Sequence, residues 1–207
     1  MTRPLGVILA GGLSRRMGGG DKCLLALEDK PLLSHAISRL SPQVAALVLN
    51  ANGDPARFAD FGLPVVSDSI EGFAGPLAGV LAGLDYAAAH GFDRIVTAAA
   101  DTPFLPADLV DRLLDAAAQA GTPMAMAATP DPERGLSRHP TFALWPVALR
   151  EDLRQALTDG VRKVIAWTDR HGCTSVTFGI DPIAPFFNVN TPDDLARAKQ
   201  MLKELAT

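Results

Sequence analysis

The sequence contains little cysteine and no excess of positive charge. Its two cysteines, Cys23 and Cys173, lie far apart and form neither a CxxC pair nor a disulfide framework, so we expect a reduced, cytoplasmic protein. The formal net charge of the 207 residues is -4. An acidic chain lacks the basic surface of a general nucleic-acid-binding protein, so we expect no nucleic acid among its partners.

Long apolar runs and metal-binding histidine patterns are missing as well. The first apolar run, residues 5–10, is too short for a secretory core, and Arg15 and Arg16 follow it on the wrong side. No run approaches the ~18 apolar residues that a membrane span needs, so we expect no association with a membrane. The four histidines show neither HxxxH nor HExxH spacing, which argues against a zinc site.

What the chain does contain is an alternation of short apolar runs and helical patterns. With 48% hydrophobic residues, its length suits one domain with a sizeable core. We expect strands at residues 6–10, 44–50, 64–67, 93–100, 124–128, 141–144 and 174–178, and helices at 31–40, 75–90, 106–120 and 193–205. This alternation predicts an α/β fold with a mainly parallel central sheet that helices cover on both faces. Residues 129–140 form the least regular stretch, which we interpret as a functional loop or a lobe boundary.

Four of these strands end in glycine or polar residues. A glycine-rich loop follows the first, and Asn50, Asp68 and Asp101 end the next three in the order of the sequence. In open α/β sheets, ligands bind outside the carboxyl ends of the strands. We therefore predict a ligand site at this edge of the sheet.

The loop after the first strand, LAGGLSRRMGGGDK at residues 9–22, contains five glycines and three cationic residues. Glycine lets main-chain N–H groups approach a ligand closely, and arginine and lysine add phosphate contacts, so a polyphosphate is the expected ligand. The loop is not a Walker A motif, because Asp21 separates Gly20 from Lys22 and Cys23 follows in place of Ser or Thr. The alternative is a glycine-rich surface turn with solvated arginines.

Each polar residue at the predicted edge also has an ordinary structural explanation. Asp101 could hold Mg²⁺ or cap the following turn. Asp68 and Asn50 could contact a nucleotide or satisfy their own turns. Asn188 and Asn190 share one side of an extended segment and could contact a polar ligand, or serve as turn residues before a helix.

Two further features leave alternatives open. The small residues of GPLAG, residues 75–79, could let a planar base approach a helix start, or could permit tight packing of the helix on the sheet. Cys23, next to Lys22, could be a reactive thiol or a small buried filler.

Taken together, the motifs resemble those of the molybdenum cofactor guanylyltransferases. The resemblance runs nearly end to end, and its motifs are the loop at residues 9–22, NAN at 50–52, Asp68, GPLAG at 75–79, DTP at 101–103, RHPTFAL at 138–144 and FNVNTPDDL at 187–195. The loop alone is typical of the wider nucleotidyltransferase superfamily. The closing NVNTPDDL and the HPT segment favour this family.

The resemblance implies a Rossmann-like three-layer sandwich in which residues 1–207 form one domain, with GTP bound by the N-terminal half and the pterin by the C-terminal half. It implies transfer of GMP from GTP to molybdopterin carrying molybdenum, with pyrophosphate as the second product. Partners that deliver molybdopterin, and chaperones of molybdoenzymes, are also expected.

The resemblance further assigns roles to individual residues. The GTP-binding residues would be Leu9, Ala10, Gly11, Gly12, Lys22, Asn50, Asp68, Leu77 and Asp101. Arg16, Lys22 and Asp101 would be catalytic, and Asp101 would also hold Mg²⁺. Asn188 and Asn190 would lie on the pterin side. Cys23 departs from the family, whose members often have glycine there.

Three rival functions share parts of this pattern. A cytidylyltransferase for the same pterin would use CTP, and a sugar-phosphate nucleotidyltransferase would have a different second lobe. A non-catalytic nucleotide-binding protein would bind without turnover. The base preference does not follow from the residues alone, because amide and main-chain groups can serve either base.

Overall fold

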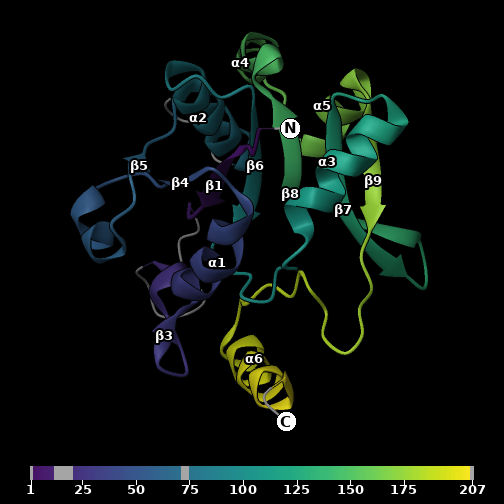
Figure 1. Cartoon of the computed structure of the whole chain (residues 1–207). Coiled ribbons are helices and arrows are strands. Elements are labelled where there is room, and N and C mark those ends of the chain that lie inside the picture. The colour runs from purple at the N-terminus through teal and green to yellow at the C-terminus, as the bar shows by residue number, and fades with distance from the viewer. Residues whose placement is uncertain (1, 12–20, 71–74, 206–207) are drawn as a thin grey trace.

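A seven-stranded sheet forms the centre of the protein, with strand order β5-β4-β1-β6-β8-β7-β9 (Figure 1). The computed structural model describes residues 2–11, 21–70 and 75–205. The sheet strands are β1 (Leu5–Leu9), β4 (Ala46–Asn50), β5 (Val65–Val66), β6 (Arg94–Ala99), β7 (Met124–Asp131), β8 (Gly135–Pro146) and β9 (Cys173–Thr177). A separate hairpin pairs β2 (Ala26–Leu27) with β3 (Lys30–Pro31).

Six α-helices and four 3₁₀ segments lie in the described part of the chain. The α-helices are α1 (Leu32–Leu40), α2 (Pro76–Ala89), α3 (Leu109–Ala120), α4 (Arg150–Thr158), α5 (Val164–His171) and α6 (Pro192–Leu205). The 3₁₀ segments are η1 (Lys22–Leu24), η2 (Ser41–Gln43), η3 (Pro55–Phe61) and η4 (Val147–Leu149). In Figure 1, α6 stands apart from the sheet, below α1.

Most strand pairs are parallel, as the alternation of strands and helices predicted. β1 pairs with β4 and β6, β4 with β5, and β7 with β9, all in parallel. β8 is the exception, since it runs antiparallel to both β6 and β7. The carboxyl ends of β5, β4, β1 and β6 therefore meet at one edge of the sheet.

Both faces of the sheet carry a hydrophobic core, which confirms the prediction of a three-layer arrangement. Val7 and Ile8 are neighbours in β1 and point to opposite faces, as the pleat of a strand requires. Ile8 packs with residues of α1 and α3, including Leu33 and Leu113. Val7 packs with residues of α2, α4 and α5, including Trp167, which is 1% exposed.

A third, smaller core attaches the C-terminal helix. Ala198 and Met201 of α6 pack with Leu27 of the β2–β3 hairpin and with Val189. The C-terminal segment is thereby held against elements that follow the glycine-rich loop. This contact positions Asn188 and Asn190, on either side of Val189, beside Lys22.

Residues 129–140, predicted to be an irregular functional loop, belong instead to the hairpin of β7 and β8. The carboxylate of Asp131 accepts hydrogen bonds from the main-chain N–H groups of Glu133 and Arg134, each at 2.9 Å. Gly135 then takes a φ of +76°, which glycine adopts easily. The proline and charged residues that suggested irregularity thus form the tight turn of a long ribbon.

Helices α4 and α5 were not predicted from the sequence. Leu153, Ala156 and Leu157 of α4 are buried at the helical spacing i, i+3 and i+4. Val164, Trp167 and Thr168 of α5 repeat this spacing. The apolar residues are few because each helix is short and only one stripe faces the sheet.

No helix in the described part of the chain is both long enough and apolar enough to span a membrane.

Candidate active site

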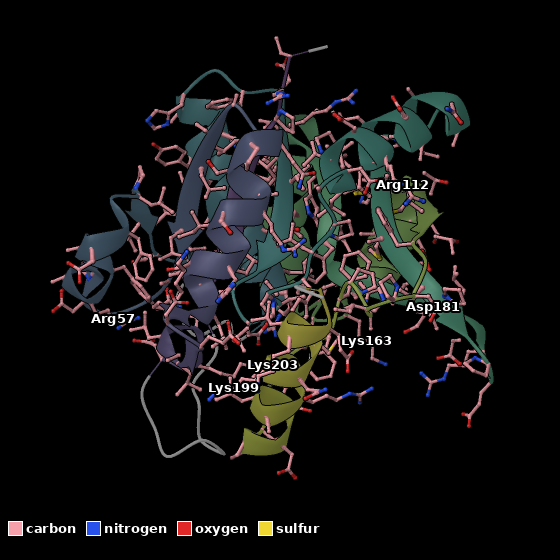
Figure 2. The ribbon with its side chains drawn as sticks, turned by 60° about the horizontal axis from the view of Figure 1, so that its bottom comes forward. Arg57, Arg112, Lys163, Asp181, Lys199 and Lys203 are labelled. Carbon is pink, nitrogen blue, oxygen red and sulfur yellow. The ribbon has the colours of Figure 1, made fainter. Side chains whose placement is uncertain are left out.

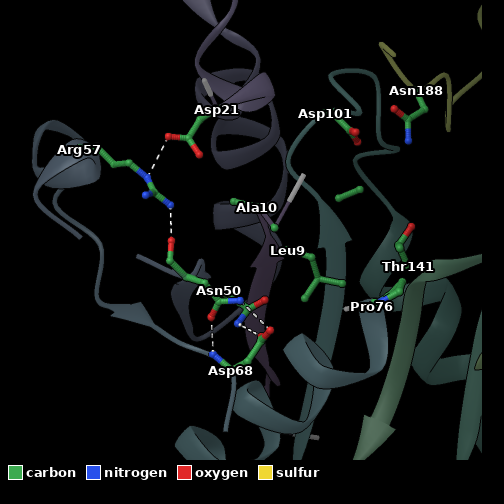
Figure 3. A pocket seen from close by; sticks show the side chains of 14 residues that line it. Leu9, Ala10, Asp21, Asn50, Arg57, Asp68, Pro76, Asp101, Thr141 and Asn188 are labelled. Atoms are coloured by element: carbon green, nitrogen blue, oxygen red, sulfur yellow. Dashed lines mark hydrogen bonds and ion pairs between the residues drawn. The ribbon is translucent and has the colours of Figure 1, made fainter. Parts of the chain in front are cut away.

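A cavity of about 470 Å³ opens at the carboxyl ends of β5, β4, β1 and β6 (Figure 3). It is lined by Leu9, Ala10, Gly11, Asp21, Asn50, Asn52, Arg57, Asp68, Gly75, Pro76, Ala99, Asp101, Thr141 and Asn188. The prediction that one edge of the sheet gathers Gly11, Asn50, Asp68 and Asp101 is confirmed, while residues 12–20 of the glycine-rich loop lie outside the described part of the chain.

Lys22 and Asp101 meet at one end of this site. The ammonium group of Lys22 forms an ion pair with Asp101 and donates hydrogen bonds to Asn190 Oδ1 at 2.7 Å and Asn188 Oδ1 at 3.3 Å. The side chains of Lys22 and Asp101 are 13% and 16% exposed, so water screens their attraction only partly. Three side-chain oxygens from two distant parts of the sequence therefore surround one cationic group.

Main-chain hydrogen bonds hold the segment that carries Asn188 and Asn190 in place. The N–H of Val189 donates to the carbonyl oxygen of Asp101 at 3.0 Å. Asp194, in the first turn of α6, accepts from the N–H groups of Asn190 and Thr191, both at 2.9 Å. These bonds hold the pKa of the Asp194 carboxyl below its usual value. Asn190 therefore belongs to a helix cap through its main chain, while its side chain faces Lys22.

Asn50 and Asp68 meet at the other end of the cavity. Asn50 is 4% exposed, and its Nδ2 donates to Asp68 Oδ1 at 3.0 Å and to the carbonyl oxygen of Val66 at 3.2 Å. Adjacent strands are ~4.8 Å apart, so the three strand intervals from β5 to β6 separate the Asp68 end from the Asp101 end by about 14 Å. The two carboxylates cannot share one metal ion, whose oxygen ligands lie about 2–2.6 Å away.

Gly79 allows helix α2 to lie directly beneath Asn50. A Cβ atom at this position would come within 2.9 Å of Leu9 Cδ2 and 3.0 Å of Asn50 Cγ, closer than real Cβ contacts. Gly83 is similarly close to Val7. For these glycines the packing explanation is correct, while Gly75 and Pro76 of the same motif line the cavity.

We expect Gly79→Ala to weaken both the fold and the site. The added methyl group must displace Leu9 or Asn50, and overpacking of this kind costs about 1–3 kcal/mol. Loss of the bond from Asn50 to Asp68 should also lower nucleotide affinity. Thermal unfolding and nucleotide titration measure the two effects, and Ala89→Gly, an exposed change near the end of the same helix, reports the size of the effect of helix propensity. An unchanged affinity together with full stability would contradict the packing argument.

Leu77, assigned to GTP binding by resemblance, has its side chain in the core. It is 2% exposed, packs with Val48 and Val80, and does not line the cavity. Its position in the first turn of α2 turns its side chain toward the sheet. Gly12 and Arg16 lie outside the described residues.

Cys23 is a buried filler and not an activated thiol. It is 3% exposed, and burial, with the negative charges of Asp21 and Asp101, raises its pKa to about 12. The thiol therefore stays protonated near neutral pH. The thiol of Cys173 also stays protonated near neutral pH, because burial raises its pKa to about 11.

Seven lining residues were not among the site residues assigned from the sequence: Asp21, Asn52, Arg57, Gly75, Pro76, Ala99 and Thr141. Asn52 belongs to the NAN motif and Thr141 to RHPTFAL, so both lie in motifs from which a role at the site could have been predicted. Nothing in the local sequence distinguishes Arg57 from a solvated surface arginine, because its contacts depend on the folded chain.

Comparison with known proteins agrees with this geometry. Residues 6–172 match the model of the MobA-like NTP transferase domain. A molybdenum cofactor guanylyltransferase of Bradyrhizobium sp. (strain ORS 278) is 53% identical over 199 residues, covering 95% of this chain and 92% of the relative. One from Mesorhizobium japonicum is 51% identical over 210 residues, covering 98% and 97%.

This chain belongs to the MobA-like NTP transferase family. Its nearly full-length similarity to molybdenum cofactor guanylyltransferases confirms the resemblance inferred from the motifs. The fold agrees too, since the crystal structure of molybdopterin-guanine dinucleotide biosynthesis protein A from Archaeoglobus fulgidus superposes with a TM-score of 0.74. That structure is 24% identical and covers 97% of this chain and 99% of its own. The MobA-like domain match ends at residue 172, before Asn188 and Asn190.

Proposed function

We propose that this protein transfers GMP from GTP to molybdopterin carrying molybdenum, forming the guanine dinucleotide cofactor and releasing pyrophosphate. The relatives named molybdenum cofactor guanylyltransferase support this activity. The observation that carries it is the cavity itself, with Asp101, which pairs with Lys22, at one end and the Asn50–Asp68 pair about 14 Å away at the other. An extended nucleoside triphosphate needs both ends, one for its phosphates and one for its base.

The residues around Lys22 fit a divalent metal ion. Mg²⁺ prefers hard oxygen ligands and is often bound through one or two carboxylates together with phosphate oxygens. Asp101 supplies such a carboxylate, while the amide oxygens of Asn188 and Asn190 accept hydrogen bonds from Lys22 and are not assigned to the metal. When bound, Mg²⁺ would polarise the α-phosphate and neutralise charge on the leaving pyrophosphate.

The remaining chemistry is positioning and charge neutralisation. The terminal phosphate of the pterin is anionic near neutral pH, so its oxygen attacks the α-phosphorus of GTP without a general base. The bond between the α-phosphorus and the bridging oxygen breaks, and pyrophosphate leaves with the electron pair. Lys22 would stabilise the charge that builds on the β- and γ-phosphates. Arg16 is proposed for the same task.

The pterin would enter from the side of β8 and the C-terminal segment. Thr141 of β8 and Asn188 line this side of the cavity, opposite the Asp68 end. We therefore propose that the N-terminal half of one domain binds GTP and that the C-terminal half, with Asn188 and Asn190, contacts the pterin. A cytoplasmic location, and partners that deliver molybdopterin or receive the product, belong to the same proposal.

A pyrophosphate-release assay with each of the four nucleoside triphosphates, with and without molybdenum-loaded molybdopterin, tests the function. Release with GTP that depends on the pterin is the expected result. Preference for CTP would identify a cytidylyltransferase, and release only with sugar phosphates would indicate a different acceptor class. Nucleotide binding with no release under any condition would contradict an enzymatic role.

A further inference from the structure

The carboxylate of Asp68 is held from both sides by amide groups. Asn50 Nδ2 donates to Oδ1 at 3.0 Å, and Asn52 Nδ2 donates to Oδ2 at 2.7 Å. The main-chain N–H of Asp68 in turn donates to Asn52 Oδ1 at 2.8 Å. The amide of Asn52 thus makes two bonds to one residue, although Asn52 lies on the surface.

These side-chain bonds matter because the main chain fixes Asp68 weakly. Asp68 follows β5, an edge strand of two residues that pairs with β4 at Leu49 and Asn50. The register places Asn50 opposite Val66, so Asn52 continues the pairing opposite Asp68. The side-chain amide of Asn52 therefore continues the hydrogen bonding between the two strands beyond their last main-chain pair.

Arg57, which lies at the outer edge of the molecule in Figure 2, contacts both Asn52 and Asp21 at the cavity (Figure 3). It projects from η3, pairs through Nε with Asp21 Oδ2 at 2.8 Å, and donates from Nη2 to the carbonyl oxygen of Asn52. The guanidinium lies so close to Gly53 that a Cβ there would come within 2.9 Å of Nη1. Gly53 has a φ of +87°, so its backbone conformation favours glycine.

The result is a carboxylate with a defined orientation at the base end of the cavity. Each oxygen of Asp68 accepts one amide hydrogen and keeps a further lone pair for a ligand. A carboxylate in this orientation can accept hydrogen bonds from two donors that lie side by side on a ligand. Guanine has such a pair in its ring N1–H and its 2-amino group, whereas adenine, cytosine and uracil each place a donor next to an acceptor.

We propose that Asn52 and Arg57 are positioning residues that set the base selectivity of the pocket. Asn52 holds the Asp68 carboxylate in the orientation that accepts both guanine donors, and Arg57 holds Asn52 and ties it to Asp21 at the end of the glycine-rich loop. The inference rests on the proposed use of GTP as donor. It adds two residues that do not touch the reacting atoms.

Nucleotide titration with GTP and with ITP, which lacks the 2-amino group, tests the proposal. The wild type should prefer GTP by about tenfold or more, the value of one hydrogen bond to a charged group. Asn52→Ala should reduce that preference to near unity, and Arg57→Ala should reduce it partly. In turnover, the KM for GTP should rise while kcat changes little, because base contacts are made equally in the ground and transition states.

Further variants separate orientation from general damage. Asn52→Leu keeps the approximate shape of the side chain but loses the donor to the carboxylate without adding charge, so it should also lose the GTP preference. Asp60→Ala, an exposed change on the same η3 segment, should behave as the wild type. A wild type that discriminates GTP from ITP, together with Asn52 variants that keep the same ratio, would overturn the inference. A wild type that binds no nucleotide would instead overturn the proposed function, and the inference with it.

Discussion

Asp101→Ala should reduce GMP transfer by about 10²–10³-fold while the fold survives. The variant removes the carboxylate that lines the cavity beside Lys22 and that we propose holds a metal ion. Loss of one such preorganised electrostatic contact typically raises the barrier by ~2.7–4 kcal/mol. The fold should persist because the hydrogen bond from Val189 N–H goes to the carbonyl oxygen of Asp101, which the substitution keeps.

Pyrophosphate release at saturating GTP and pterin measures the rate, and thermal unfolding checks the fold. Asp115→Ala is a matched control, since it removes an exposed carboxylate from α3, away from the cavity. It should retain wild-type turnover. Near-normal turnover of Asp101→Ala at ordinary Mg²⁺ concentrations would reject the metal-binding role.

Lys22→Ala should lower turnover by about 10²-fold or more and also loosen the C-terminal segment. Without the ammonium group, charge on the leaving phosphates loses a fixed partner. The bonds to Asn188 and Asn190 disappear as well, so a contact between η1 and the segment before α6 is lost. The variant also leaves Asp101 without its ion-pair partner in a partly buried site.

Two measurements separate these effects. Turnover measures the lost stabilisation of charge on the phosphates. Hydrogen exchange of residues 186–191 measures how far the C-terminal segment is loosened. Lys22→Arg should recover part of the turnover because it keeps the positive charge, and Lys30→Ala, on the exposed β2–β3 hairpin, should change neither quantity. Rapid turnover by Lys22→Ala, or unchanged exchange in the segment, would show that the corresponding contact is dispensable.

The edge of the sheet that carries the site could be predicted from sequence because it depends on local pattern. Apolar runs followed by Asn50, Asp68 and Asp101 identify strand ends, and parallel strands bring such ends together. The same reasoning could not predict that β8 runs antiparallel. Its direction is set by the tight turn after Asp131, and a turn built from proline and charged residues looks like any polar loop.

The contacts that orient the site depend on pairings between distant segments. Asn52 and Asp68 are joined because β4 pairs with β5 in one particular register, and that register is not evident from either strand alone. Arg57 reaches Asp21 only after η3 has folded over the end of the sheet. Lys22 meets Asn190 across most of the sequence, through the small core that attaches α6.

The reversed direction of β8 has a consequence for how the acceptor side of the molecule can vary. Thr141 borders the cavity, and the strand continues from there back to Gly135, six residues or about 20 Å away, so the tip of the β7–β8 ribbon lies well away from this lining residue and projects from the side of the sheet (Figure 1). Side chains in a strand alternate between faces with a period of two. Adding or removing residues in pairs at the tip would therefore change the length of the ribbon without turning the Thr141 side chain away from the cavity.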